Sequence, residues 1–444
     1  MAASALAATS LRAAPPVKPT ALDRYVAAPD ESFTHHVVSD NTREGLREIV
    51  VEFTSQTWRT TADVDRTLWK HWLSIVIPPE AHRDTAMLFI SGGSNEGEAP
   101  IGADERMRLV ALATKSIVVA LGQVPNQPLV FHNDGQQRYE DDLISYTWRK
   151  FIETGDETWP AQLPMTKSAV RAMDVAQQVI GTETSGHKIE HFVVAGASKR
   201  GWTTWLTAAV DPRVVAIAPI VIDVLNVRRS LRHHHEVYGF WAPAIGDYER
   251  AGLADELDRK ECRDLLAIVD PNVYRDRFTM PKCIINASGD EFFVPDSSQF
   301  YFHTLPREKH LCYVPNTGHS LKGTDALDTL IAFHHSVLYK TERPTLAWTS
   351  GADGEWRLAS SAPPRSVVLW SANNPTKRDF RHEEIGSAFH PEALSASAKG
   401  EYVVSAPKPA RGWTAYFAQA EYEIGAARPW RISTPVWVVG PNAK

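Results

Sequence analysis

The segment from His191 to Ala209 contains the serine whose surroundings best suit nucleophilic chemistry. It reads HFVVAGASKRGWTTWLTAA, in which an apolar strand pattern runs into Gly196, Ser198 and Gly201 and then directly into a helical pattern. A serine on so sharp a turn presents its hydroxyl above the sheet, and small neighbours let the backbone turn tightly. We therefore predict that Ser198 is the nucleophile, although the usual GxSxG pattern has its second glycine one position earlier. The alternative is that Ser198 caps the following helix.

An acid and a histidine follow two later strand patterns. The pattern PKCIIN precedes Asp290, and the pattern LCYV precedes His319. This gives the chain order Ser, Asp, His that an α/β hydrolase requires. We expect Asp290 to accept the Nδ1 proton of His319, so that Nε2 can take the hydroxyl proton from Ser198. Glu291 and Asp296 are rival acids, and Asp290 is preferred because it comes first after the strand.

The oxyanion of a tetrahedral intermediate needs two backbone N–H donors. The residue after the nucleophile, Lys199, supplies one of them in this kind of site. The second is expected in the loop SGGSN, where Gly92 and Gly93 follow an early strand pattern and allow close approach of a substrate oxygen. The alternative for this loop is a flexible turn without a role in catalysis.

Five side chains near these motifs are predicted to bind the substrate: Asn95, Glu96, Arg200, Trp202 and Trp241. The nature of the substrate stays open at this point. Basic residues beside Ser198 and downstream suit a carboxylate, as in a sugar-acid ester; they are Lys199, Arg200, Arg228, Arg229 and Arg232. The acidic Glu96 and Glu236 suit instead the amino terminus of a peptide, which would make the protein an exopeptidase.

From about residue 85 to 340, β-branched runs alternate with helical patterns, which is typical of βαβ units and a mostly parallel sheet. One predicted helix covers Ser168 to Ile180. The predicted strands are Met87 to Ile90, Ser116 to Leu121, His191 to Ala195, Val214 to Val221, Cys283 to Asn286 and Leu311 to Val314. We therefore predict an α/β-hydrolase fold for residues 25–340, with an inserted cap at 226–280.

After Lys340 the pattern changes to short alternating runs between Gly, Pro and Asn turns, which predicts a β-sandwich over residues 345–444. The joint is expected at Thr341 to Pro344. Six tryptophans of this part either bind carbohydrate or fill the sandwich core, and we favour the core: Trp348, Trp356, Trp370, Trp413, Trp430 and Trp437. Residues 1–24, rich in alanine, are expected to be a disordered tail or the remnant of an export signal.

Composition excludes several other classes of function. The net charge of -6 and the absence of a lysine- or arginine-rich run argue against nucleic-acid binding. No apolar run reaches the roughly 18 residues of a membrane helix, so no membrane partner is expected. The three cysteines form no CxxC pair, and the run His233 to Glu236 points its side chains in different directions. We therefore predict neither a metal site nor a cofactor, and the sequence does not indicate an oligomeric state.

Several longer motifs resemble the family of PhoPQ-activated pathogenicity-related proteins, a branch of the α/β hydrolases. They are SQTWR at 55–59, SGGSN at 91–95, VPNQPL at 124–129, the pair Glu140 and Asp141, LPMTKSAVRAMD at 163–174, GASKRGWTTW at 196–205, SGDEFFVPDSS at 288–298 and PNTGHSL at 315–321. The resemblance implies a triad of Ser198, Asp290 and His319 and an often exported protein. It implies no particular substrate.

Together these observations predict a serine hydrolase that cleaves a carboxylic ester or amide through an acyl-enzyme. Its partner is then a small ester or amide, or a peptide in the exopeptidase alternative. A secreted signalling or binding module with incidental catalysis is the third alternative. The resemblance favours a secreted or periplasmic location, whereas the N-terminal sequence lacks the basic start of an export signal.

Overall fold

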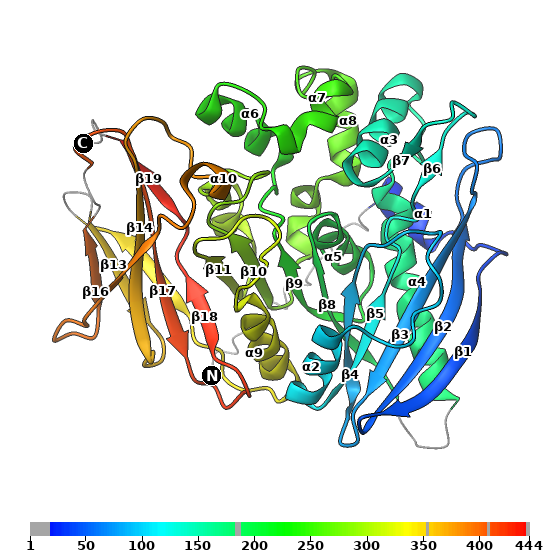
Figure 1. Cartoon of the computed structure of the whole chain (residues 1–444), viewed down its shortest axis with the longest axis horizontal. Coiled ribbons are helices and arrows are strands. Elements are labelled where there is room, and N and C mark those ends of the chain that lie inside the picture. Colours follow the sequence, from blue (N-terminus) through cyan, green and yellow to red (C-terminus); the bar gives the residue numbers. More distant parts are fainter. Residues whose placement is uncertain (1–17, 183–187, 352–354, 406–408, 441–444) are drawn as a thin grey trace, which may run out of the picture.

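The computed structural model describes residues 18–182, 188–351, 355–405 and 409–440. Its centre is a large mixed sheet in the order β1-β2-β3-β5-β4-β8-β9-β10-β11, which continues into the C-terminal strands (Figure 1). The bounds of these nine strands are β1 Thr34–Arg43, β2 Leu46–Thr57, β3 Leu68–Ile77, β4 His82–Ile90, β5 Ser116–Leu121, β8 His191–Ala197, β9 Val214–Ile220, β10 Lys282–Ala287 and β11 Lys309–Val314.

Strands β5, β4, β8, β9, β10 and β11 are parallel to one another, whereas β3 is antiparallel to both β2 and β5. Six of these strands are the six predicted ones, with ends that differ by a few residues. Strands β1 to β3 were not predicted individually. The outer strand β1 is exposed or half-buried along its length, so its sequence THHVVSDNTR lacks the apolar run of a central strand.

Helices cover both faces of this sheet. Helices α1 (Ala21–Ala27), α4 (Gln162–Gly181) and α5 (Lys199–Val210) pack on one face, and α2 (Glu105–Thr114) and α9 (Ala326–Leu338) pack on the other. Consecutive side chains of a strand point to opposite faces, and Val193 and Val194 accordingly belong to two different apolar cores. This arrangement confirms the predicted α/β architecture. The predicted helix over 168–180 is the later part of α4.

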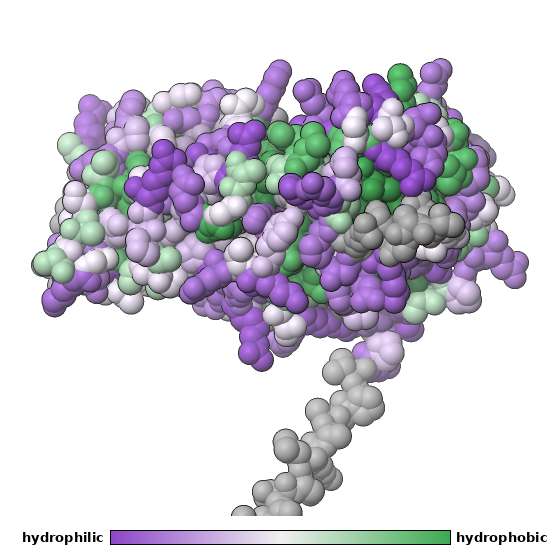
Figure 2. Space-filling model, turned by 90° about the horizontal axis from the view of Figure 1, so that it is seen from below, coloured by the Kyte–Doolittle hydropathy of each residue, from purple (hydrophilic) through white to green (hydrophobic). Residues whose placement is uncertain are grey.

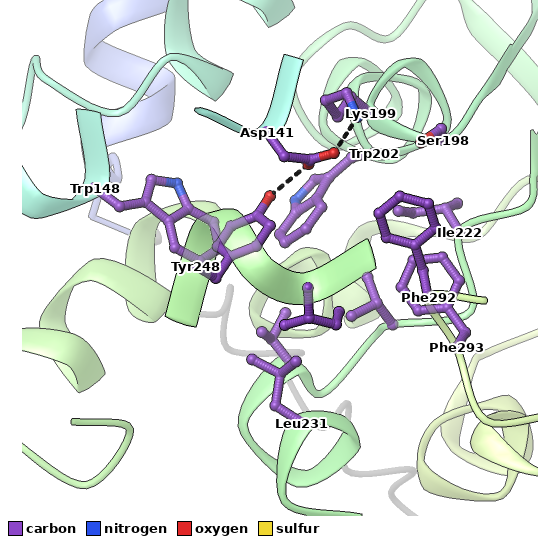
Figure 3. A pocket seen from close by; sticks show the side chains of 13 residues that line it. Asp141, Trp148, Ser198, Lys199, Trp202, Ile222, Leu231, Tyr248, Phe292 and Phe293 are labelled. Carbon is purple, nitrogen blue, oxygen red and sulfur yellow. Dashed lines mark hydrogen bonds and ion pairs between the residues drawn. The ribbon is translucent and has the colours of Figure 1, made fainter. Parts of the chain in front are cut away.

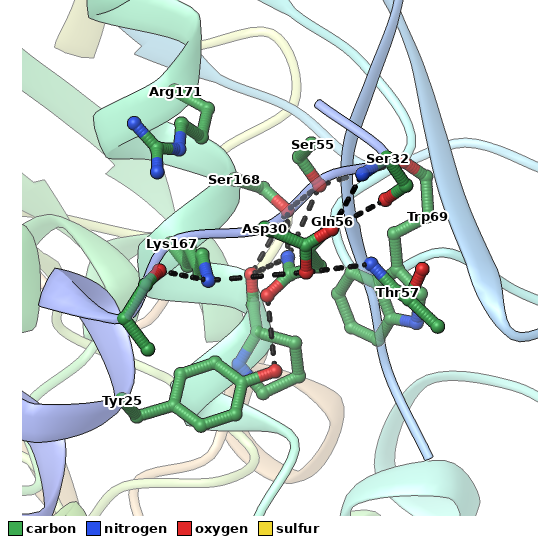
Figure 4. Close-up of polar contacts among 12 residues, drawn as sticks. Tyr25, Asp30, Ser32, Ser55, Gln56, Thr57, Trp69, Lys167, Ser168 and Arg171 are labelled. Carbon is green, nitrogen blue, oxygen red and sulfur yellow. Dashed lines mark hydrogen bonds and ion pairs between the residues drawn. The ribbon is translucent and has the colours of Figure 1, made fainter. Parts of the chain in front are cut away.

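Helix α1 is tied to the sheet by a buried polar network (Figure 4). The Tyr25 hydroxyl donates to Gln56 Oε1 at 3.0 Å, and the Gln56 amide donates to the Pro164 carbonyl on α4 at 2.8 Å. Asp30 accepts the N–H of Thr57 at 3.0 Å. The predicted tail of residues 1–24 therefore ends too late, because α1 is already folded from Ala21 onward. Residues 1–17 lie outside the described part of the chain.

The C-terminal part is rich in strands, as predicted. Its strands are β12 Leu346–Ser350, β13 Glu355–Ser360, β14 Ser366–Asn374, β15 His390–Ala393, β16 Tyr402–Ser405, β17 Trp413–Tyr422, β18 Trp430–Ser433 and β19 Trp437–Val439. β12, β13 and β16 form a separate sheet that packs on β17 and β19, where Trp356 stacks on Trp437 with ring centroids 4.4 Å apart. Of the six tryptophans expected in the core, Trp430 is fully buried and the other five are partly buried and pack against the two apolar cores.

One feature of this β domain was not predicted, namely its edge-to-edge junction with the central sheet. Strand β18 pairs with β11 through Leu311 and Ser433, so β18, β17, β14 and β15 extend the central sheet. The Ser433 hydroxyl also accepts the N–H of Tyr313 at 2.9 Å, and the Gln419 amide donates to the Tyr313 carbonyl at 3.0 Å. Hydrogen bonds of β-sheet type therefore join the two parts of the molecule.

The predicted cap segment, residues 226–280, is helical and lies at the top of Figure 1. It contains α6 (Val227–Tyr238), η1 (Pro243–Ile245), α7 (Gly246–Arg250), α8 (Lys260–Val269) and η2 (Pro271–Arg277), all between β9 and β10.

The face of the molecule shown in Figure 2 is mostly hydrophilic, with hydrophobic residues in separate groups. Within the described ranges, no helix combines the length and apolar character needed to cross a bilayer.

Candidate active site

Ser198 lies between the end of β8 and the start of α5 in a strained backbone conformation. Its φ is 58° and its ψ is -126°, a combination that residues other than glycine rarely adopt. The two nearby glycines are sterically required: a Cβ on Gly196 would lie 2.7 Å from the Arg200 carbonyl oxygen, and one on Gly201 would lie 2.8 Å from Ile222. The later second glycine is therefore compatible with a nucleophile elbow. No helix-capping hydrogen bond is made by the Ser198 side chain.

Asp290 holds the imidazole of His319. Nδ1 of His319 lies 2.9 Å from Asp290 Oδ2 and 3.1 Å from Oδ1. Burial by itself lowers the pKa of His319, but the charge and hydrogen bond of Asp290, together with the charge of Glu291, outweigh it and raise the pKa above its usual value. The hydrogen bond also favours the tautomer in which Nε2 is free to accept a proton.

The rival acids have other partners. Glu291 accepts the backbone N–H of His319 at 2.8 Å. Asp296 lies 2.8 Å from Nε2 of His233 on the cap helix α6 and 2.5 Å from Arg378 of the β domain. Asp290 is therefore the acid placed to orient the imidazole, whereas Asp296 connects the loop after β10 to the cap and the β domain.

Ser198 and His319 both lie near Phe292. The Phe292 ring lies 4.4 Å from the His319 ring and lines the same pocket as Ser198. Nε2 of His319 is buried and has no hydrogen-bond partner in the structure. The Ser198 hydroxyl therefore does not donate to His319 here, and a side-chain adjustment is needed to close that contact. Such contacts are often long or misaligned in enzymes without substrate.

The predicted oxyanion donors lie on adjacent segments. β4 and β8 are parallel with Ile90 opposite Gly196, so the loop with Gly92 and the turn with Ser198 both follow the ends of neighbouring strands. A Cβ on Gly92 would overlap the guanidinium group of Arg200, which shows how closely this loop approaches the start of α5. Lys199 is the first residue of α5, and the N–H groups of a helix's first turn have no partner within the helix.

A compact ionic network surrounds the start of α5. Lys199 Nζ lies 2.7 Å from Asp141 and 3.2 Å from Glu140, and Arg200 binds Glu140 through both terminal nitrogens at 2.8 and 2.6 Å. Burial raises the pKa of Glu140, but Arg200 and Lys199 lower it more, to about 2. Tyr248 of α7 donates to Asp141 at 2.9 Å. The cations beside Ser198 are thus already paired with carboxylates.

The two acids of this network begin helix α3 (Glu140–Thr154). In the sequence they belong only to a motif of the family resemblance, and no site role is predicted for them from their pattern. An acidic pair in the first turn of a helix is favoured by the helix dipole, which is a common pattern and gives no hint of a contact with α5. The contact depends on how α3 packs, and the local sequence does not show it.

A largely apolar pocket opens beside Ser198, with an empty volume of about 480 Å³ that includes space open to solvent (Figure 3). Cap residues Leu231 and Tyr248 form one side, and Trp148, Trp202 and Phe292 contribute aromatic faces. The remaining lining residues are Asp141, Lys199, Ile222, Val224, Val227, Ile245 and Phe293. Trp202 was predicted to bind the substrate, whereas Trp148, Tyr248 and Phe292 were not predicted.

The other predicted substrate residues do not line this pocket. Asn95 donates to the Pro128 carbonyl at 2.9 Å, Glu96 lies 3.1 Å from Arg66, and Arg200 is held by Glu140. Trp241 stacks on His234 of the cap with ring centroids 5.8 Å apart.

Three basic residues of the cap are of a type that suits a substrate carboxylate. Each of them has a partner within the cap or close to it. Arg228 and Arg232 both pair with Asp258. Arg229 lies over the Phe300 ring at 5.2 Å. Among the described residues, no group of three or more His, Cys, Asp or Glu side chains is arranged to hold a metal ion.

A segment of the β domain contacts both loops that carry the acid and the histidine. The N–H of His382 donates to the Gly289 carbonyl at 2.8 Å, next to Asp290. Asn316, three residues before His319, accepts the N–H of Phe389 at 2.8 Å and donates to its carbonyl at 2.9 Å. Residues 374–389 thus form a clamp segment, which includes α10 (His382–Ile385), against the loops of the candidate site.

The strand order, in which β3 is antiparallel to both its neighbours, the serine elbow after β8, the acid after β10 and the histidine after β11 define the α/β-hydrolase fold. More narrowly, the chain belongs to the family of PhoPQ-activated pathogenicity-related proteins, whose model matches residues 22–381. It is also 40% identical over 427 residues to autocrine proliferation repressor protein A of Dictyostelium discoideum, which covers 91% of this chain and 86% of that protein.

Solved structures with a similar fold are more distant. Acetyl xylan esterase 1 from a Thermoanaerobacterium species is 16% identical with a TM-score of 0.47, over 72% of this chain and 91% of that one. A glucuronoyl esterase from Solibacter usitatus is 12% identical with a TM-score of 0.43, over the same shares of the two chains. These similarities concern the polypeptide fold.

Proposed function

We propose that this protein is a serine hydrolase that cleaves a carboxylic ester or amide through an acyl-enzyme. The observation that carries the proposal is the bond between His319 and Asp290 at the sheet edge where the strained elbow holds Ser198. The buried, unpartnered Nε2 of His319 supports it further, since buried polar atoms normally have a partner.

In the proposed reaction, Ser198 Oγ attacks the substrate carbonyl while His319 Nε2 takes the hydroxyl proton. The N–H groups of Lys199 and of the loop at Gly92 and Gly93 stabilise the oxyanion. His319 then returns the proton to the leaving alcohol or amine, and the acyl group stays on Ser198. Water attacks the acyl-enzyme with the same base, releasing the acid and restoring the serine.

The test is fluorophosphonate labelling together with turnover of p-nitrophenyl acetate. Ser198→Ala should abolish labelling and lower kcat by on the order of 10⁶-fold if the three residues act as a unit. Ser39→Ala, on the outer strand β1, is the matched control and should keep both. Undiminished labelling of Ser198→Ala would refute the proposal.

A signalling role is the second candidate, and one comparison favours it. The 40% identical relative is named an autocrine proliferation repressor, and such a role would place this protein outside the cell, in line with the expected secreted or periplasmic location. If purified protein represses proliferation of the cells that produce it, the Ser198→Ala variant separates the two functions. Retained repression by this variant would assign the effect to binding, and lost repression would assign it to hydrolysis.

A further inference from the structure

A second cavity lies next to the pocket beside Ser198 and is lined mostly by cap residues. It shares Trp148, Leu231, Ile245 and Tyr248 with the first pocket. Its other lining residues are Leu253, Ala254, Leu257, Cys262, Leu265 and Leu266. The two cavities are therefore neighbours, the first lined by Ser198 and the second by Cys262, Leu265 and Leu266 of α8.

The polar atoms of the aromatic walls are already used by the protein. Trp148 Nε1 donates to Gln162 at 2.9 Å, Trp202 Nε1 donates to the Val269 carbonyl at 2.6 Å, and the Tyr248 hydroxyl donates to Asp141. These side chains therefore offer carbon faces to an occupant. A group bound there gains burial of apolar surface and few new hydrogen bonds.

The walls also lack an unpaired charge. Among the described residues that line the two cavities, Asp141 and Lys199 are the charged ones, and they form an ion pair with each other at 2.7 Å. A charged substrate group would lose its hydration there without meeting a free counter-charge. This argues against both a carboxylate and a peptide amino terminus as the group bound beneath the cap.

We infer that the two cavities hold an uncharged apolar part of the substrate, an alkyl or aryl group attached to the bond that Ser198 attacks. This inference rests on the proposed function, and it names the substrate class of the same site. Cleavage follows the acyl-enzyme steps given above and needs no other reactant than water.

Two series of neutral esters test the inference with the full-length protein. One series lengthens the acyl chain of p-nitrophenyl esters from acetyl to decanoyl, and the other lengthens the alcohol of acetate esters from methyl to octyl. In one of the two series, kcat/KM should rise by up to about fourfold for each methylene that is buried. Flat or falling kcat/KM in both series would overturn the inference.

Variants of the deeper cavity give an independent readout. Ala254→Phe should fill it, lowering kcat/KM for the longest good substrates by tenfold or more relative to p-nitrophenyl acetate. Leu257→Ala, at a half-buried position, should move the optimum to longer chains. Ala267→Phe, at an exposed position on α8, is the matched control and should leave the profile unchanged. Equal effects of Ala254→Phe on all lengths, with no shift in Leu257→Ala, would overturn the inference.

Charged probes complete the test. Esters of succinate and of 4-aminobutyrate should react at less than one tenth of the rate of the butyrate ester, and aminoacyl anilides should not be preferred. A preference for either charged ester or for the anilides would assign the cavities to an ionic group and overturn the inference. If Ser198 is labelled but kcat/KM does not depend on chain length, this inference is overturned and the proposed function stands. If neither labelling nor ester turnover is observed, both the inference and the proposed function are overturned.

Discussion

At the scale of single residues, the candidate site depends on which atom of His319 carries a proton. Asp290 fixes the ring from the Nδ1 side, and Nε2 remains buried and unpaired. The positions of Ser198, Asp290 and His319 after β8, β10 and β11 were predictable because their chain order and the preceding strand patterns follow from the sequence alone. Asp141, Trp148 and Tyr248 were not predictable, because their roles arise from how α3 and the cap pack over α5.

The raised pKa of His319 predicts the acid limb of the pH profile. The neutral ring is the active base, so kcat/KM should fall as the pH drops through a midpoint above the ordinary histidine value of 6.5. Asp290→Asn should move this midpoint to lower pH, because it removes the anion that stabilises the charged ring, and should lower kcat by on the order of 10⁴-fold. Glu291→Gln is the control, and it should move the midpoint less than Asp290→Asn does. An unmoved midpoint in Asp290→Asn would contradict the assignment of the acid.

A second titrating residue, Asp223, affects stability. It is fully buried and accepts the hydroxyls of Tyr301 at 2.6 Å and Tyr313 at 2.5 Å. Burial raises its pKa from 3.8 to about 7, because the effect of burial and of the charges of Asp290 and Asp296 exceeds that of the two tyrosines.

The fold therefore favours protonated Asp223, and this contribution is complete below about pH 4 and is lost as the pH rises through about 7. Asp223→Asn should make the free energy of unfolding less dependent on pH between 5 and 8, by at most about 1.4 kcal/mol per pH unit. Asp276→Asn, whose side chain is 91% exposed, is the control. Denaturant titrations at several pH values measure this, and parallel curves for Asp223→Asn and wild type would disprove it.

At the scale of elements, sequence patterns gave no indication of the clamp segment 374–389. The parallel strands were predictable because each is a short apolar run bounded by turns. The clamp segment has no such periodicity, and its contacts with Gly289 and Asn316 join residues far apart in the chain. Long-range contacts of this kind leave no local signal.

Arg378→Gln tests whether this segment positions the site. It removes the charge that holds Asp296 between the β domain and His233, and small displacements of reacting groups can cost up to about 10²-fold in rate. We expect a lower kcat with a smaller change in KM for short esters. Lys377→Gln is the matched control, since Lys377 pairs with Glu384 within the segment. Equal kinetics of the two variants would show that the segment only supports the fold.

At the scale of the whole molecule, four strands of the β domain continue the sheet that carries the site. The family match extends to residue 381 and so crosses the predicted joint at 341–344. Strand β18 covers the edge of β11, and Trp430 packs against His310 and Phe333. Sequence patterns predicted that the C-terminal part is rich in strands. They did not predict that β18 pairs with β11, because a contact through a single residue pair leaves no recognisable pattern.

Truncation after residue 340 should therefore also disturb the central sheet. It uncovers the edge of β11 and the apolar surface beneath β18, and exposed strand edges promote aggregation. We expect the truncated chain to be insoluble or to elute as aggregates in size-exclusion chromatography, whereas the full chain elutes without them. A monomeric, fluorophosphonate-reactive truncated protein would show that residues 25–340 are self-sufficient.

The contacts of His382 and Phe389 with the loops of Asp290 and His319 have a consequence for the newly made polypeptide. A ribosome releases the acid and histidine loops well before it has added the residues that fasten them. Under the proposed mechanism, the hydroxyl of Ser198 is then present without a firmly placed base, so we expect the growing chain to stay inert toward esters until the last part of translation.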